Sequence, residues 1–149
     1  DVIGKKICFI KVDLSDSDAC AKAFKTHVDA KAVIHFAAFK SVQESISKPN
    51  EYYRNNIGSL LNVTTSMEKY DMPYLVFSSS CTVYGIPEGK IQVDENTPLQ
   101  KPNSPYGHTK SMSEQIIKDV CESSKIKASL LRYLRSYNVW CQSSNIDTL

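Results

Sequence analysis

Short apolar runs alternate along the chain with longer segments in which apolar residues recur at helical spacing. The apolar runs have the length and composition of β-strands and cover residues 7–12, 32–37, 74–77 and 128–133. The helical spacing predicts helices over residues 19–27, 52–70 and 106–121. Residues 45–49 predict a break, and the polar, proline-rich residues 87–105 predict a loop.

This alternation predicts the fold class. Strands that are apolar on both faces and separated by helices are typical of a parallel sheet covered by helices on both sides. A chain of 149 residues has room for one such domain. We therefore predict an α/β fold built on a parallel sheet.

Charge, hydropathy and cysteine content exclude several other classes of protein. Lys and Arg total 18 against 16 Asp and Glu, a net charge of +2 that is too balanced for a nucleic-acid-binding or polybasic membrane protein. No apolar run approaches the ~20 residues of a membrane span. The five cysteines are scattered without a Cys-x-x-Cys pair, which indicates neither a disulfide framework nor a metal site. We expect a soluble, cytoplasmic protein with no metal, nucleic-acid or membrane partner.

The strongest candidate for a catalytic pair is Tyr106 with Lys110. Ser104 and Pro105 suit the cap and the first position of the helix that carries them. The pair is therefore expected about one turn apart on the same helix face. A nearby ammonium favours the phenolate form of tyrosine, which makes Tyr106 a candidate general base. The alternative is a surface tyrosine and lysine at a frequent spacing.

Two strand ends add further candidates. Residues 78–85 follow one predicted strand with three serines, and residues 35–40 end another with two alanines and Lys40. Ligands bind at the carboxyl ends of parallel strands, where a hydroxyl can bond a substrate oxygen and small residues allow close approach. The alternatives are a serine-rich turn and a solvated lysine.

Five segments carry a family resemblance, in this order along the chain: Val33–Lys40, Lys48-Pro49, Tyr52–Asn56, Val76–Gly85 and Ser104–Lys110. Together they resemble the UDP-glucose 4-epimerases, a family of the extended short-chain dehydrogenase/reductase superfamily. The resemblance runs from about Ile7 to Tyr133. It implies a partial Rossmann-like, doubly wound parallel sheet.

The resemblance also implies an activity and its residues. The family are isomerases of galactose metabolism that hold NAD and interconvert UDP-glucose and UDP-galactose by oxidation and re-reduction at C4. It implies that Tyr106 takes the 4-hydroxyl proton, that Lys110 holds the nicotinamide ribose, and that Ser80 bonds the sugar oxygen and relays its proton. The residues it places at the cofactor are Asp13, Leu14, Phe36, Ala37, Ala38, Lys40, Asn55, Ser78, Tyr106, Lys110 and Tyr133.

Related activities leave alternatives open. Nucleotide-sugar 4,6-dehydratases resemble this chain but carry Thr-Asp-Glu where it has Ser80-Cys81-Thr82, which favours epimerisation over dehydration. Epimerases acting on other nucleotide sugars remain an alternative, as does a non-functional gene fragment. The resemblance implies a homodimer in which helices 52–70 and 106–121 pair between subunits. Their apolar residues could equally belong to an ordinary core.

The chain also departs from the family. No Gly-x-x-Gly-x-x-Gly loop, which seats a pyrophosphate on a helix N-terminus, occurs in the 149 residues, and Ala38 stands where the family has glycine. From Leu134 onward we find no resemblance. We therefore divide the chain into a partial NAD-binding domain, residues 1–133, and a non-family tail, residues 134–149, and expect a fragment without the C-terminal substrate domain. Alone it is expected to be inactive and poorly folded, with the strand at Ile34 as an apolar edge.

Overall fold

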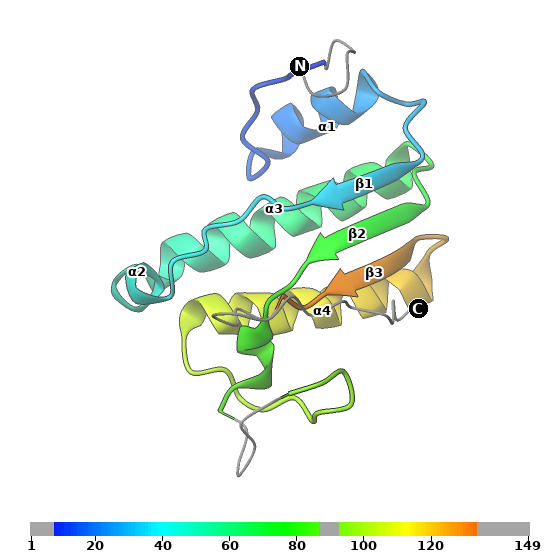
Figure 1. Cartoon of the computed structure of the whole chain (residues 1–149). Coiled ribbons are helices and arrows are strands. Elements are labelled where there is room, and N and C mark those ends of the chain that lie inside the picture. Colours follow the sequence, from blue (N-terminus) through cyan, green and yellow to red (C-terminus); the bar gives the residue numbers. More distant parts are fainter. Residues whose placement is uncertain (1–7, 87–92, 134–149) are drawn as a thin grey trace.

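Strands and helices alternate along the chain as its hydrophobic pattern predicts (Figure 1). A computed structural model describes residues 8–86 and 93–133. Its elements are α1 (Ser17–Lys25), β1 (Ala32–His35), α2 (Val42–Ser47), α3 (Pro49–Lys69), β2 (Tyr74–Ser78), the 3-10 helix η1 (Cys81–Tyr84), α4 (Pro105–Ser123) and β3 (Lys127–Leu131). The strands form a parallel sheet in the order β1-β2-β3, so the predicted α/β class and partial Rossmann-like sheet are confirmed.

Side-chain caps fix where the helices begin. Asp16 caps α1 by accepting hydrogen bonds from the backbone N–H groups of Asp18 and Ala19, both at 3.0 Å. Ser104 caps α4 by accepting from the backbone N–H of Gly107 at 3.1 Å, and Pro105 occupies the first turn. The start of α4 is therefore determined locally, which places the residues that follow on a defined helix face.

The hydrophobic core lies between the sheet and the helices beneath it. Its buried members from α3 and α4 are Leu60, Val63, Met67 and Ile117, and those from the strands are Leu75, Phe77 and Ala128. Of the central strand β2, Leu75 and Phe77 belong to this core. The carboxyl end of β2 therefore follows directly after a core residue.

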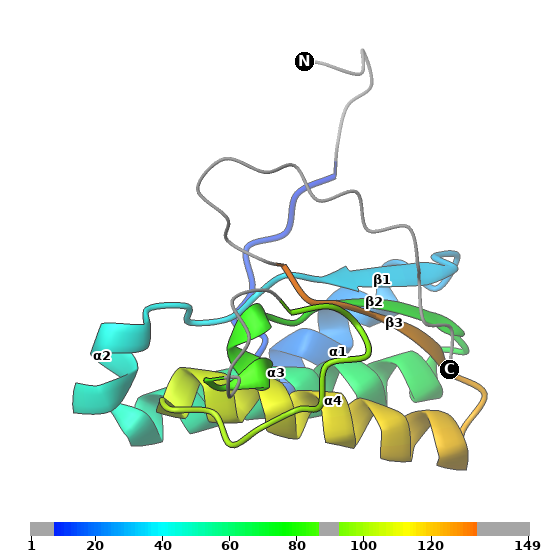
Figure 2. The ribbon, with the colours of Figure 1, turned by 60° about the horizontal axis from the view of Figure 1, so that its bottom comes forward.

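Helices cover only one face of the described sheet, not both as predicted (Figure 2). The two crossovers, β1-α3-β2 and β2-α4-β3, run in the same direction across the sheet. Right-handed crossovers that run in one direction place their helices on the same face. Ile34 is 61% exposed, and its strand β1 is an edge strand of the described sheet, as predicted.

Two local predictions were wrong. Residues 8–12 form no strand, because β1 pairs with β2 alone and offers them no described partner. Part of the predicted break at residues 45–49 is helical, since Ser41 caps α2 by accepting from the backbone N–H of Glu44 at 3.2 Å. The predicted tail, residues 134–149, lies outside the described residues. Among the described helices, none is long and apolar enough to cross a membrane.

Candidate active site at the carboxyl ends of the strands

Lys110 is buried against the carboxyl end of β2. Only 4% of the residue is exposed, and its Nζ donates a hydrogen bond to the carbonyl oxygen of Ser78 at 2.7 Å. The Nζ lies 4.7 Å from the ring centroid of Phe77. Burial lowers the pKa of Lys110 to about 8, because removal from water disfavours the charged form. The lysine therefore stays a cation at neutral pH and loses its proton within the range in which enzymes work.

Tyr106 lies one helical turn before Lys110 and is 9% exposed. Both side chains lie on the same face of α4, as their spacing predicts. The two residues are buried, so the surface-pair alternative is wrong. A phenol and an ammonium therefore share one buried helix face, and their acid–base role stays a prediction.

Ser80 begins η1, directly after β2. Its Oγ accepts a hydrogen bond from the backbone N–H of Thr82 at 3.3 Å, which leaves its own O–H free to donate elsewhere. The helix α4 packs against η1 at Gly107, where an added Cβ would lie 3.4 Å from the Cβ of Thr82. The loop that carries Ser80 is thus packed against the helix turn that carries Tyr106.

His35, which sequence reasoning did not single out, is buried at the end of β1. It is 4% exposed, and its ring stacks on Phe77 at a centroid distance of 5.9 Å. Burial, and secondarily the charge of Lys110, lower the pKa of His35 to about 4. His35 is therefore neutral at neutral pH and adds no second positive charge beside Lys110.

We expect His35 to make the protein sensitive to acid. Its folded pKa of about 4 lies below the usual histidine pKa of 6.5, so the unfolded state binds the proton more tightly. Stability should fall by about 3 kcal/mol as the pH drops from 6.5 to 4. In a full-length relative whose matching segment is replaced by residues 8–133 of this chain, a His35→Phe variant, which keeps an aromatic ring beside Phe77, should lose this part of the acid sensitivity in thermal unfolding. A His27→Phe control should keep it, and an unchanged acid slope in His35→Phe would contradict the assignment.

A cleft of about 650 Å³ opens beside the ends of β1 and α3. Five of the residues predicted to contact a cofactor line it: Asp13, Leu14, Ala37, Ala38 and Asn55. Asp13 presents a carboxylate whose pKa is lowered by hydrogen bonds from the side chain and the backbone of Ser15. An ionised carboxylate on a cleft wall suits the hydroxyl or amino donors of a nucleoside.

The remaining predicted residues lie elsewhere. Ser78 accepts the hydrogen bond from Lys110, whereas Phe36 and Lys40 are exposed outside the lining of the cleft. Tyr133 is 52% exposed, and its carbonyl oxygen accepts from the backbone N–H of Cys81 at 3.2 Å. The structure therefore brings the predicted residues together in two groups, one in the cleft and one at the end of β2.

Asn56 links these two groups, and sequence reasoning missed it. Its side chain is 4% exposed; the Oδ1 accepts from the backbone N–H of Phe39 at 2.8 Å, and the Nδ2 donates to the carbonyl of Phe39 and to Thr109 Oγ1, both at 3.0 Å. Thr109 in turn donates to the carbonyl of Tyr106 at 2.7 Å. A buried amide with all of these partners ties the cleft wall to α4.

Comparisons with known proteins agree with this geometry. The model of the NAD dependent epimerase/dehydratase family matches residues 2–143. The UDP-glucose 4-epimerase of Schizosaccharomyces pombe is 46% identical over 134 residues, which are 87% of this chain and 37% of that protein. The division of the chain at Tyr133 stays a prediction.

Two solved structures are also similar. The UDP-glucose 4-epimerase from Bifidobacterium longum, in complex with NAD⁺ and UDP, superposes with a TM-score of 0.83 at 38% identity, over 89% of this chain and 39% of that one. The UDP-Glc/GlcNAc 4-epimerase from Campylobacter jejuni gives 0.82 at 32% identity, over 89% of this chain and 40% of that one. The chain thus spans about two fifths of the length of these relatives.

Proposed function

The chain belongs to the NAD-dependent epimerase/dehydratase family, and from this we propose that it carries the catalytic part of a UDP-glucose 4-epimerase. Such an enzyme interconverts UDP-glucose and UDP-galactose by oxidation and re-reduction at C4 of the sugar. The observation that carries the proposal is the buried pair Tyr106 and Lys110 at the carboxyl end of β2. The similarity to the S. pombe epimerase supports the choice of reaction within the family.

The described residues fit NAD. The cleft has a carboxylate at Asp13, two small residues at Ala37 and Ala38, and the amide of Asn55, and the separate group at the end of β2 adds the ammonium of Lys110. These groups suit the hydroxyls, the rings and the ribose of a dinucleotide. When bound, NAD supplies a hydride acceptor and donor for C4.

Three side chains have separate roles in the proposed reaction at C4. Tyr106 takes the proton of the 4-hydroxyl as the sugar is oxidised and returns it as the sugar is reduced. Lys110 remains cationic below its pKa of about 8 and holds a positive charge on the helix face that carries Tyr106. Ser80 donates its free hydroxyl hydrogen to the sugar oxygen and so orients it between base and cofactor.

A second substrate is favoured by one comparison. The C. jejuni relative is described as a UDP-Glc/GlcNAc 4-epimerase, so UDP-N-acetylglucosamine is the alternative sugar for the same reaction.

We further propose that the protein is cytoplasmic. The free cysteines of the described residues, Cys8, Cys20, Cys81 and Cys121, support a reducing compartment.

A hybrid enzyme tests the proposed function. Residues 8–133 of this chain would replace the matching segment of the S. pombe epimerase, which supplies the flanking parts. We expect the hybrid to convert UDP-galactose to UDP-glucose, and the 149-residue chain alone to convert neither sugar. A folded hybrid that retains NAD but epimerises neither UDP-galactose nor UDP-N-acetylgalactosamine would contradict the proposal.

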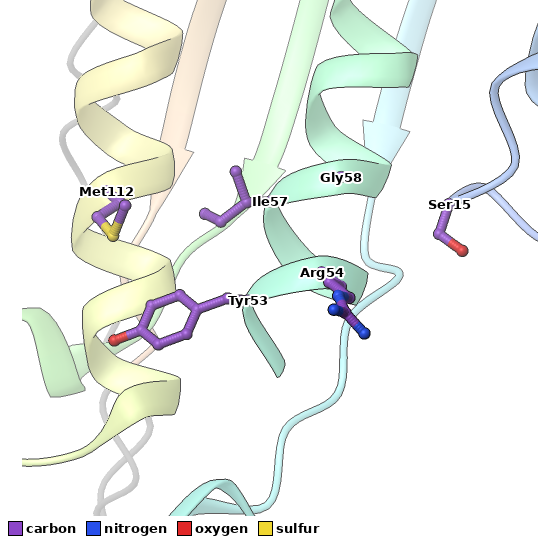
Figure 3. Close-up of a pocket in the computed structure, with 6 residues that line it drawn as sticks. All are labelled: Ser15, Tyr53, Arg54, Ile57, Gly58 and Met112. Carbon is purple, nitrogen blue, oxygen red and sulfur yellow. The ribbon is translucent and has the colours of Figure 1, made fainter. Parts of the chain in front are cut away.

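We also propose a homodimer formed through α3 and α4. A groove of about 730 Å³ on their outer face is lined by Tyr53 and Ile57 of α3 and Met112 of α4, as Figure 3 shows. Met112 is 47% exposed and Leu61, also on α3, is 46% exposed. Apolar side chains gathered on a two-helix surface suit packing against the same pair of helices from a second copy.

Charge on this outer face should separate the subunits. A hybrid carrying Leu61→Glu and Met112→Glu is expected to sediment as a monomer in analytical ultracentrifugation, because dimer formation would bury four unpaired carboxylates. Val28→Glu provides the matched control, since Val28 is 57% exposed on a different surface. A dimer that survives the double substitution would contradict the assignment of this interface.

A further inference from the structure

Three buried residues form one line along α4. Tyr106, Lys110 and Glu114 follow each other at intervals of four residues and are 9%, 4% and 2% exposed. Two of them contact consecutive residues at the end of β2. Lys110 donates to the carbonyl of Ser78, and Glu114 accepts a hydrogen bond from the hydroxyl of Ser79. The proposed mechanism uses the first two residues of this line and leaves Glu114 without a role.

Glu114 is held by Arg132, just beyond β3. The guanidinium donates from Nε to Glu114 Oε1 at 2.9 Å and from Nη2 to Oε2 at 2.7 Å, a two-bond pairing that fixes both groups in one plane. These hydrogen bonds raise the pKa of Arg132 above its usual value. Glu114 is thus buried and accepts hydrogen bonds from residues that directly follow two strands, Ser79 after β2 and Arg132 after β3.

Arg132 also reaches the far end of η1. Its Nη1 donates to Tyr84 Oη at 3.2 Å, and its guanidinium carbon lies 5.2 Å from the centroid of the Tyr84 ring. The segment from Ser79 to Tyr84 is thus tied at both ends to the Glu114–Arg132 pair. Ser80, to which the proposed mechanism assigns the hydrogen bond to the sugar oxygen, lies inside this segment.

We propose that the buried Glu114–Arg132 pair is a positioning element that fixes the Ser80 hydroxyl against Tyr106 and Lys110. This inference rests on the proposed function, since it assigns a role to the pair in that same site. The pair touches neither the substrate nor the base. It sets the distance between the loop that orients the sugar oxygen and the helix that carries the base.

A purely stabilising role explains the pair less well. The Glu114 side chain is 3% exposed and that of Arg132 is 20% exposed. Desolvation of the two charges offsets much of their attraction, so an apolar pair would stabilise a core about as well. What a two-bond ion pair supplies is a fixed geometry. An error of about 1 Å in the position of a catalytic group costs on the order of a hundredfold in rate. Fixed geometry is what a hydroxyl donor at Ser80 requires.

Substitutions in the hybrid enzyme test this role. Glu114→Gln keeps the shape of the side chain but turns an amide NH₂ toward the donors of Arg132. We expect kcat to fall roughly tenfold to a hundredfold, with KM within about twofold of the unsubstituted hybrid. Arg132→Lys should lower kcat by a similar factor, because lysine cannot make the two-bond contact with Glu114. Glu51→Gln is the matched control, since its ion pair with Lys48 is exposed and lies far along the chain from the site.

A double-substitution cycle separates positioning from stability. If Glu114 acts through Ser80, then Glu114→Gln should reduce kcat little further in a Ser80→Ala background. Equal reductions in kcat in both backgrounds, or a lowered melting temperature with unchanged kcat, would overturn the proposal.

A measurement that needs no substrate distinguishes failure of the positioning proposal from failure of the proposed function. Hydrogen exchange of the backbone amides of residues 79–84 should be faster in Glu114→Gln than in Glu51→Gln. If the hybrid has no epimerase activity but this exchange difference is present, the proposed function fails while the positioning element stands. If exchange is unchanged, the positioning proposal fails whatever the activity.

Discussion

Replacing Tyr106 by phenylalanine is expected to lower kcat of the hybrid enzyme roughly a thousandfold, with little change in KM. In the proposed mechanism the phenol takes the 4-hydroxyl proton, and phenylalanine keeps the shape of the side chain while removing that oxygen. Because Tyr106 is 9% exposed and its backbone carbonyl accepts from Thr109, the fold around it should persist.

Steady-state conversion of UDP-galactose measures the effect, with thermal unfolding as the check on the fold. Tyr53→Phe is the matched control, because Tyr53 lies in the groove on the outer face of α3 and α4. It should retain full kcat. A Tyr106→Phe enzyme within tenfold of the unsubstituted rate would show that another group is the base.

Lys110→Met has the second largest expected effect. The substitution removes the buried cation and its hydrogen bond to the carbonyl of Ser78, so the helix face that carries Tyr106 loses its positive charge. We expect kcat at neutral pH to fall roughly a hundredfold. Methionine has a similar length and suits the apolar contact with Phe77.

The pH profile identifies the cause of this loss. Because the pKa of Lys110 is lowered to about 8, its charge is present below that pH and lost above it. The unsubstituted enzyme should therefore lose activity as the pH rises through about 8, and Lys110→Met should lack this falling limb. Lys118→Met, on the same helix but outside the site, should keep the full profile. A falling limb that persists in Lys110→Met would assign it to another group.

Local sequence signals predicted the elements that carry the site. Ser104 and Pro105 mark the start of α4 through side-chain and backbone chemistry that involves only neighbouring residues, and the structure confirms that cap. The spacing of Tyr106 and Lys110 then places them on one face without further information. The cleft residues Asp13 and Ala37 were also predicted, through the family resemblance, and the structure brings them together.

Long-range partners could not be predicted in the same way. Whether residues 8–12 form a strand depends on a neighbouring strand, and their own composition carries no information about it. The coverage of one sheet face depends on the direction of the crossovers. The roles of Asn56 and Glu114 arise from partners 53 and 18 residues away, Thr109 and Arg132. A polar residue within a predicted helix gives no sign in the sequence of a hydrogen-bond partner so far along the chain.

The fate of the hydrogen at C4 tests the central claim most directly. The hybrid enzyme would convert UDP-galactose that carries deuterium at C4, in ordinary water, and the product would be analysed by mass spectrometry and NMR. Oxidation and re-reduction within one closed site predict UDP-glucose that retains the deuterium at C4. Loss of the label to water would show removal of that hydrogen as a proton, and would contradict the assignment of Tyr106, Lys110 and Ser80 to an oxidation and re-reduction at this carbon.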